Sequence, residues 1–380
     1  MVERPAARGM SLALGLMSVL VIASEFGRTL PAEGLWDFGS FVASGRAARD
    51  GLNPYGIYPL TLHVVLPGFE SWNPNLNPPI SAILFQVFDL ADPHLTFRAW
   101  WVISICCYAA AVILLLRRYG GGQLVPIGVT AFALAGFWDT LLLGQIYVPL
   151  ALAAAAAWLL LERGADRWAG LLMGVVIAMK PNFLVWPVVL LLAGHRLAAG
   201  VSLATALGIS AIPLAVFGPE IYRQWFELIA SDHERAFFLT NASLSGLAAR
   251  ASLPWLGTIV SFTILAALAW WAIRYEPSKM RASALALVAA LLASPLAWVH
   301  YTLFLLPVFV SRWSSLPIRA AMLLLIVPVP FIIGQFGKPA LVQFTIGSVY
   351  AWALVLCALT LALEEFPGFG GRRDGARARI

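Results

Sequence analysis

The chain has 380 residues, of which 61% are hydrophobic and 12% are charged, and its mean hydropathy is +0.83. Soluble domains carry about 25% charged residues, so this composition excludes an ordinary soluble protein and predicts an all-α polytopic membrane protein. Arginines that flank apolar segments explain the net charge of +6, and no nucleic-acid partner is expected. Cys106, Cys107 and Cys357 lie inside apolar runs and indicate neither a disulfide framework nor a metal site.

The apolar segments predict about twelve membrane spans. Arg4 and Arg8 precede the first segment without a convincing cleavage site, which predicts an uncleaved signal-anchor helix. The segments are 10–26, 95–116, 124–143, 146–161, 168–180, 182–194, 198–217, 254–273, 282–299, 301–311, 320–336 and 341–363. Several are shorter than the ~20 residues that a span needs, so we expect them to be tilted, broken or sheltered by neighbours. Residues 79–91 are also too short and are predicted to be re-entrant or interfacial.

The first long polar interval, residues 34–59, is expected to carry function. Apolar side chains from Phe38 to Ala48 recur there at helical spacing, which predicts a short amphipathic helix lying on the membrane surface. Asp37 stands at the start of this helix and has two interpretations. It is either the N-cap, a position that Asp favours, or a general base displayed at the membrane surface.

The distribution of charge predicts the orientation. With twelve spans both termini lie on one side, together with 16 of the 25 Lys and Arg residues and seven of the 19 acidic ones. The positive-inside rule makes that side cytoplasmic. The loops 27–78 and 218–252 then face outward. Residues 1–366 form a single integral-membrane unit, and the Gly/Arg-rich tail 367–380 is expected to be disordered in the cytoplasm.

Polar residues at membrane depth are costly and are therefore candidates for function. Lys180 ends an apolar segment and precedes Pro181, so it either snorkels to the interface or binds a lipid phosphate between two short helices. Asp139 and Gln145 flank an outward-facing turn, where Gln145 is either turn punctuation or a functional amide. His300 is either a packing residue or a group that works near neutral pH.

The second outward loop predicts another surface helix. Ile221, Trp225 and Ile229 fall on one face of residues 219–230, as in an amphipathic helix lying on a membrane. The run Asp232-His233-Glu234 that follows is a weak metal-like pattern, and a solvated charge run is the simpler interpretation.

Five stretches, in order, resemble glycosyltransferase family 87, membrane enzymes of the GT-C fold that use polyprenyl-phosphate sugars. They are the Trp36-Asp37-Phe38 opening with GRAARDGLNPY, NLNPPISAILF, the Gly-Gln to Lys-Pro region that ends at Lys180-Pro181, TNASLSGLAAR and SPLAWVHY. Motifs of this kind are meaningful in their context rather than singly. Two positions depart from the family pattern: Tyr147 replaces a small polar residue, and Ala242 replaces Gln.

The resemblance implies transfer of mannose or a related sugar from a polyprenyl-phosphate donor to a glycolipid or glycan acceptor, on the outer face of the cytoplasmic membrane. The matched motifs single out Asp37 and His300 as catalytic residues, with Asp37 as the base for the acceptor hydroxyl. From their charge, Lys180, Arg46 and Arg49 are expected to bind the donor phosphate. The motifs add Asn77, Gln145, Asn241 and Tyr301 as substrate-binding residues.

The residue chemistry is compatible with these expectations. The sequence has no Asp-x-Asp metal motif, so we expect neither a metal nor another cofactor. Asp37 is the one obvious carboxylate, which favours an inverting displacement over a double displacement with a second carboxylate as nucleophile.

Two other classes of protein are possible. A flippase or transporter for lipid-linked sugars would share the many spans and the buried lysine, but residues 1–190 and 191–380 lack the internal repeat typical of transporters. A scaffold subunit would leave Lys180 and His300 without a role. Among enzymes, a polyprenyl-phosphate-arabinofuranose transferase is the nearest alternative.

Overall fold

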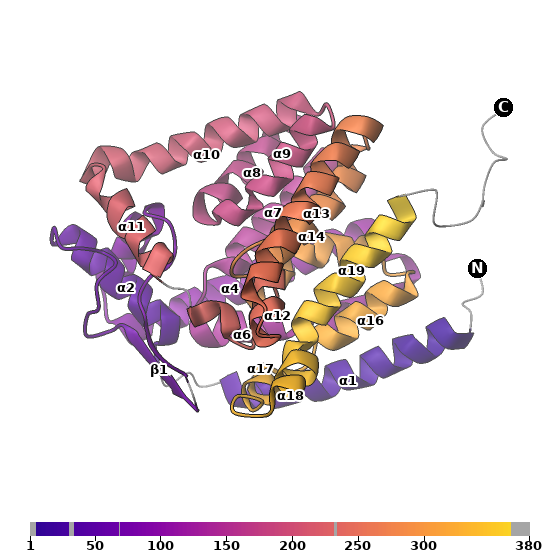
Figure 1. Ribbon diagram of the computed structural model, residues 1–380, viewed down its shortest axis with the longest axis horizontal. Helices are drawn as coiled ribbons and strands as arrows, with labels where there is room; N and C mark the ends of the chain where they lie inside the picture. The colour runs from indigo at the N-terminus through magenta and orange to yellow at the C-terminus, as the bar shows by residue number, and fades with distance from the viewer. Residues whose placement is uncertain (1–4, 30–33, 68, 232–233, 366–380) are drawn as a thin grey trace.

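The computed structural model describes residues 5–29, 34–67, 69–231 and 234–365. In this part of the chain the regular structure is helical except for one two-stranded antiparallel sheet (Figure 1). The predicted all-α class is therefore confirmed. The tail 367–380 and the pair Asp232-His233 lie outside the described residues.

The first half of the chain contains the sheet and several long helices. Its elements are α1 (Pro5–Thr29), α2 (Trp36–Arg49), β1 (Leu62–Leu66), β2 (Phe69–Asn73), α3 (Ile80–Leu84), η1 (Phe85–Asp89), α4 (Pro93–Tyr119), η2 (Gly121–Gln123), α5 (Leu124–Ala133), α6 (Ala135–Leu143), α7 (Tyr147–Glu162) and α8 (Asp166–Met179).

The second half continues as helices joined by short turns. Its elements are η3 (Pro181–Leu184), α9 (Val185–Leu192), α10 (Arg196–Phe217), α11 (Glu220–Ser231), η4 (Glu234–Phe237), α12 (Leu244–Arg250), α13 (Pro254–Tyr275), α14 (Lys279–Leu292), η5 (Val299–Leu305), α15 (Leu306–Ser311), α16 (Leu316–Leu325), α17 (Val329–Ile333), α18 (Ala340–Thr345), η6 (Ile346–Ser348) and α19 (Val349–Glu365).

The predicted number of twelve spans is not confirmed. Among the described residues, four helical segments are long and apolar enough to cross a membrane: α4, α10, α13 and Ala340–Glu364. The pair formed by α5 and α6, bent by 45°, makes a possible fifth. The other apolar helices have 10–17 residues, shorter than the ~20 that a straight span needs. They pack against the longer helices, and the predicted interfacial segment 79–91 forms the two short helices α3 and η1.

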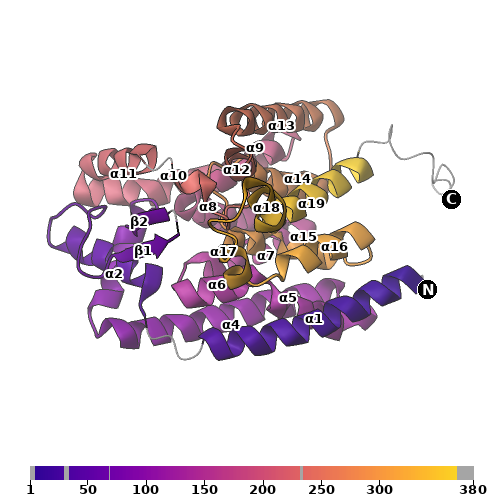
Figure 2. The same ribbon diagram turned by 60° about the horizontal axis from the view of Figure 1, so that its bottom comes forward.

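Elements from the two long loops lie together at one end of the molecule. In both views α2, the β1–β2 hairpin and α11 lie at the end opposite to the start of α1 and the end of α19 (Figures 1 and 2). The sequence predicts that the loops 27–78 and 218–252 lie on one side of the membrane and the termini on the other, and the fold is compatible with that prediction.

The helix α2 forms where predicted, but it is not a surface helix. Eleven of its residues are buried, including the serines of its supposed polar face. Ser40 Oγ accepts a hydrogen bond from the Leu62 amide (3.0 Å), and Ser44 Oγ accepts one from Asn75 Nδ2 (3.0 Å). The small and hydroxyl-bearing side chains therefore allow the hairpin and the Asn-Pro segment to pack closely on α2, which the sequence periodicity did not indicate.

The hairpin, which the sequence analysis did not predict, adds a wall beside α2. Leu62 pairs with Asn73 and Val64 with Ser71, so these residues share one face of the two strands. His63 and Trp72 lie on the opposite face, with their rings stacked at 4.3 Å. The face that carries Asn73 borders the large cavity described below.

The orientation predicted from charge can be tested by labelling. In a background without the three native cysteines, we expect a cysteine at Glu70, whose side chain is 67% exposed, to react with an impermeant maleimide in intact cells. A cysteine at Ser278, in the loop before α14, should react only after the cells are permeabilised. Labelling of the Ser278 position alone in intact cells would reverse the orientation.

Candidate active site

A cavity of about 780 Å³ opens among the elements at this end of the molecule. Its wall includes residues from α2, the hairpin, the segment 74–78, the turn before α7, the break after α8, and the segment 294–301. Six residues that the sequence motifs singled out line it together: Asp37, Asn77, Gln145, Lys180, His300 and Tyr301. A cavity of this size, with a few converging polar groups, is the usual form of a small-molecule site.

Asp37 lies in the first turn of α2, with only 4% of its surface exposed. Its carboxylate is not the helix cap, because the cap position is Leu35 and no side chain bonds there. One carboxylate oxygen accepts a hydrogen bond from Gln145 Nε2 and the other accepts one from Asn73 Nδ2. The capping interpretation is therefore wrong, and the carboxylate is held by two neutral amides on the cavity wall.

Arg235 determines how Asn73 faces Asp37. The guanidinium of Arg235 donates a hydrogen bond to Asn73 Oδ1 and another to the carbonyl of Trp72 (2.6 Å). Because the oxygen of the Asn73 amide is taken by a donor, its NH₂ group must point at the carboxylate. This relay connects η4, which carries Arg235, to the carboxylate through the hairpin.

Burial changes the pKa of the Asp37 carboxyl group, which lies in α2, outside the candidate membrane spans. Loss of hydration raises its pKa to about 6, although the hydrogen bonds from Gln145 and Asn73 act in the opposite direction. A carboxylate with this pKa is a stronger base than an exposed one and is still ionised at neutral pH.

Two glycines, Gly144 and Gly136, allow the close backbone contacts that bring Gln145 and His300 to the cavity. Gly144 has φ +68° and ends α6, and a Cβ there would come within 2.6 Å of Phe38. The turn can therefore lie against α2 and bring Gln145 to Asp37. Gly136 lies directly against the backbone at Val299, since its Cβ would be 2.6 Å from that carbonyl. This contact holds α6 beside the segment that carries His300.

Lys180 follows the last residue of α8, at the break that Pro181 was predicted to cause. It is 6% exposed, so it does not snorkel to the surface. Its ammonium donates hydrogen bonds to Asn77 Oδ1 (2.6 Å), to the Tyr147 hydroxyl and, at 3.4 Å, to the Tyr301 hydroxyl. It also lies 4.3 Å from the centre of the Tyr147 ring. No carboxylate in the described part of the chain forms an ion pair with it.

Asn77 is held in the orientation in which its side-chain oxygen faces the Lys180 ammonium. Its Nδ2 donates to Asn75 Oδ1 at 2.9 Å, which leaves Oδ1 to face Lys180. Asn75 is buried and donates in turn to Ser44 and Ser81 (3.0 and 2.9 Å). The Asn-Pro motif thus forms a rigid support for the lysine.

His300 and Asp139 form a buried pair on the same wall. His300 Nδ1 lies 2.9 Å from Asp139 Oδ2, and the His300 ring packs 4.2 Å from the Tyr147 ring. His300 Nε2 is buried and has no hydrogen-bond partner among the described residues. An unpaired buried nitrogen at a cavity wall is a ready contact for a bound ligand.

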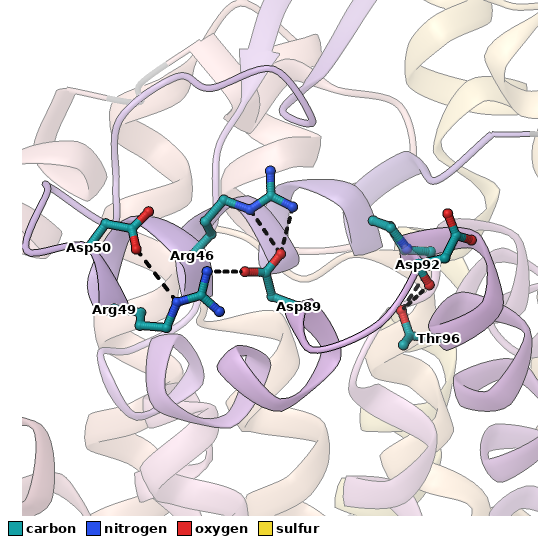
Figure 3. A network of polar contacts seen from close by, with 7 residues as sticks. Arg46, Arg49, Asp50, Asp89, Asp92 and Thr96 are labelled. Atoms are coloured by element: carbon teal, nitrogen blue, oxygen red, sulfur yellow. Dashed lines mark hydrogen bonds and ion pairs between the residues drawn. The ribbon is translucent and has the colours of Figure 1, made fainter.

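Two of the predicted phosphate ligands lie elsewhere. Arg46 and Arg49 both form ion pairs with the buried carboxylate of Asp89, at 2.6 Å each, at the end of η1 (Figure 3). Neither arginine lines the cavity. The sequence shows the two cations but not their partner 40 residues away, and the geometry does not bring them to Lys180.

Asn241, predicted to bind substrate, has a structural environment. It is completely buried, and its Oδ1 accepts hydrogen bonds from the amides of Ser243 (3.1 Å) and Ala297 (2.9 Å). Its Nδ2 donates to the carbonyls of Ala236 and Pro295. With both ends of the amide satisfied, Asn241 ties the segment 236–243 to the segment before His300 and does not line the cavity.

Asn73, Tyr147 and Arg235 line the cavity but were not predicted as site residues, and Asp139 was named only as a polar residue at membrane depth without an assigned role. Asp139 could have been paired with His300 only by knowing that α6 and η5 pack together. The metal-like run cannot be assessed, since Asp232 and His233 lie outside the described residues. Elsewhere in the described chain, no group of three His, Cys, Asp or Glu side chains could hold a metal ion.

Comparisons with known proteins assign the family. The sequence model of glycosyltransferase family 87 matches residues 75–295, a stretch that contains Asn77, Gln145 and Lys180 but neither Asp37 nor His300. A search of curated proteins gave no significant match. Among solved structures, ArnT from Cupriavidus metallidurans in the apo state is similar, with a TM-score of 0.38 and 13% identity over 95% of this chain and 78% of that one. Because the family match covers more than half of the 380 residues, the chain belongs to glycosyltransferase family 87 and is a membrane glycosyltransferase of the GT-C fold.

Proposed function

We propose that the protein transfers mannose from a polyprenyl-phosphate donor to a glycolipid or envelope glycan acceptor on the outer face of the cytoplasmic membrane. The donor phosphate binds at Lys180, and Asp37 is the general base for the acceptor hydroxyl. The reaction is a direct displacement that inverts the anomeric centre.

One observation carries this proposal: a buried carboxylate and a buried ammonium line one cavity without forming an ion pair. Asp37 is held by the amides of Gln145 and Asn73, and Lys180 is held by neutral oxygens. Buried charges are normally paired, because an unpaired charge in a poorly hydrated site is costly. An anionic donor phosphate would neutralise Lys180, and an acceptor hydroxyl would satisfy Asp37.

The chemistry follows from these two positions. Asp37 takes the proton of the acceptor hydroxyl as the hydroxyl oxygen forms its bond to the anomeric carbon. The bond from that carbon to the phosphate oxygen breaks, and its electron pair stays with the leaving polyprenyl phosphate. The leaving group gains a negative charge, which Lys180 and the hydroxyls of Tyr147 and Tyr301 are placed to stabilise.

His300 is proposed to contact the same phosphate or the sugar through Nε2. When Nδ1–H donates to the Asp139 carboxylate, Nε2 of the neutral ring accepts a hydrogen bond from a sugar hydroxyl, whereas Nε2 of the protonated ring donates one to the phosphate. Asp139 is thus a positioning residue.

The cavity contains a second carboxylate, which would be needed as the nucleophile in a double displacement. The sequence indicated Asp37 alone, but Asp139 also lines the cavity. A nucleophilic carboxylate must be free to attack the anomeric carbon, and Asp139 Oδ2 is engaged by His300 at 2.9 Å. This engagement supports the inverting displacement.

A single preparation of the purified protein can distinguish the proposed glycosyltransferase from a transporter of lipid-linked sugars. We expect the purified protein in detergent, given polyprenyl-phosphate mannose and a membrane glycolipid extract, to release polyprenyl phosphate and extend an acceptor lipid. A nucleotide-sugar donor should give no product. Movement of the intact donor across vesicles without any cleavage would instead establish a flippase.

The rate should depend on pH as the Asp37 environment dictates. A base works when it is deprotonated, so a pKa of about 6 predicts a low rate at pH 5 that rises to a plateau above about pH 7. The measurement is kcat/KM between pH 5 and 8, with donor binding measured at each pH as a control. A profile that is flat or falls between pH 5 and 7 would contradict the assignment of Asp37.

A further inference from the structure

A second hollow lies at the opposite end of α4. It is a groove of about 360 Å³ between α4 and α7, with apolar walls that include Leu114, Ala156 and Leu160. Arg117, Arg118 and Arg163 line its rim. A helix of 27 residues is about 40 Å long, so this groove is far from the cavity near the start of α4.

The charges at the rim are unbalanced. Arg118 forms an ion pair with Glu162 at 2.9 Å, and the hydroxyl of Tyr119 donates to the same carboxylate at 2.8 Å. This network consumes the Glu162 charge and joins the two helices. Arg117 and Arg163 make no ion pair within the described part of the chain, so three guanidiniums at the rim face the single Glu162 carboxylate.

The position of the groove indicates which kind of anionic ligand would suit these positive charges. The candidate span α4 ends with Arg117 and Arg118 in its last turn, which places the rim where the apolar part of the helix ends. The leucines of α4 and α7 line the groove below the rim, and the small Ala156 leaves space between them. A soluble phosphate would gain from the guanidiniums alone, whereas a phospholipid would also cover the apolar wall.

We propose that this groove binds an anionic phospholipid, with its phosphate between Arg117 and Arg163 and the start of an acyl chain against the leucines. Guanidinium groups suit phosphate because they present several donors in one plane. Basic pockets between membrane helices are known to select anionic head groups. The site is separate from the proposed sugar-transfer site and does not depend on it.

The test is lipid binding to the purified protein in neutral detergent, measured by native mass spectrometry. We expect phosphatidylglycerol to bind more tightly than phosphatidylcholine with the same chains. The double variant Arg117→Gln/Arg163→Gln should weaken phosphatidylglycerol binding roughly ten- to thirtyfold, since each basic group near a membrane contributes about fivefold. Ala156→Leu, which keeps the charge but fills the groove, should also weaken binding.

The matched control removes two exposed arginines from the starts of neighbouring helices, Arg167→Gln/Arg196→Gln. It should bind phosphatidylglycerol within about twofold of the parent. Equal losses in the two double variants would mean general surface attraction and would overturn the site. Competition by free glycerol phosphate would identify a soluble anion instead. If the first double variant does not fold, unchanged binding by Ala156→Leu would overturn the proposal by itself.

Discussion

Replacement of Asp37 with Asn is expected to lower turnover by ~10²–10⁴, the usual contribution of a general base. Asn has nearly the shape of Asp but cannot accept the proton of the acceptor hydroxyl. The fold should tolerate the change. Asn73 is fixed by Arg235 and still meets an amide oxygen, while Gln145 can turn its unpartnered Oε1 toward the new NH₂ group. Asp37→Ala should lose as much activity as Asp37→Asn.

A purely structural role for Asp37 makes a different prediction. In that case Asp37→Asn would change activity and stability very little, because Asp37 does not cap α2. Asp37→Ala would lower both more than Asp37→Asn. The burial that raises the pKa of Asp37 penalises its charged form. Its contribution to stability is therefore greatest at low pH and is lost as pH rises through about 6. Asp37→Asn should accordingly be no less stable than the parent at pH 7.5, which a melting curve would verify.

Replacement of Lys180 with Ala is expected to raise the donor KM by roughly ten- to hundredfold, the effect of losing a charged hydrogen bond. The physical reason is that the ammonium is the cation on this part of the cavity wall and has only neutral partners. Lys180→Arg should retain part of the affinity, because the charge persists while its geometry changes.

The control for Lys180 is Lys279→Ala. Lys279 is ion-paired with Asp166 at 2.5 Å and does not line the cavity, so its loss should leave the donor KM unchanged. Unchanged KM and turnover for Lys180→Ala would remove the lysine from the site and require another cation for the phosphate.

Local features of the fold could be predicted because they depend on neighbours in the sequence. The helical spacing that starts at Phe38 predicted α2, Pro181 predicted the break after Lys180, and the amphipathic pattern predicted α11. Burial of α2 could not be predicted, because it depends on the hairpin and the Asn-Pro segment packing on its serines.

The composition of the site could be predicted better than its contacts. Motif order selected Asp37, Lys180 and His300, and all three line one cavity. Their partners are distant in the sequence: Gln145 is 108 residues from Asp37, and Asp139 is 161 residues from His300. Only tertiary packing creates such pairs.

The prediction for Arg46 and Arg49 illustrates the same limit. Charge alone suggested that they bind phosphate, but Asp89 satisfies both once η1 packs on α2. Lys180 differs because the folded chain supplies it with neutral groups and leaves its charge for a ligand.

Donor affinity and turnover, measured on the same preparations of the parent, Asp37→Asn and Lys180→Ala, test the central claim most directly. A sugar-transfer site built from these two residues predicts that Asp37→Asn binds polyprenyl-phosphate mannose normally but turns it over ~10²–10⁴ times more slowly. It predicts that Lys180→Ala binds the donor roughly ten- to hundredfold more weakly. Turnover by Asp37→Asn within a few-fold of the parent, with matched stability, would contradict the account.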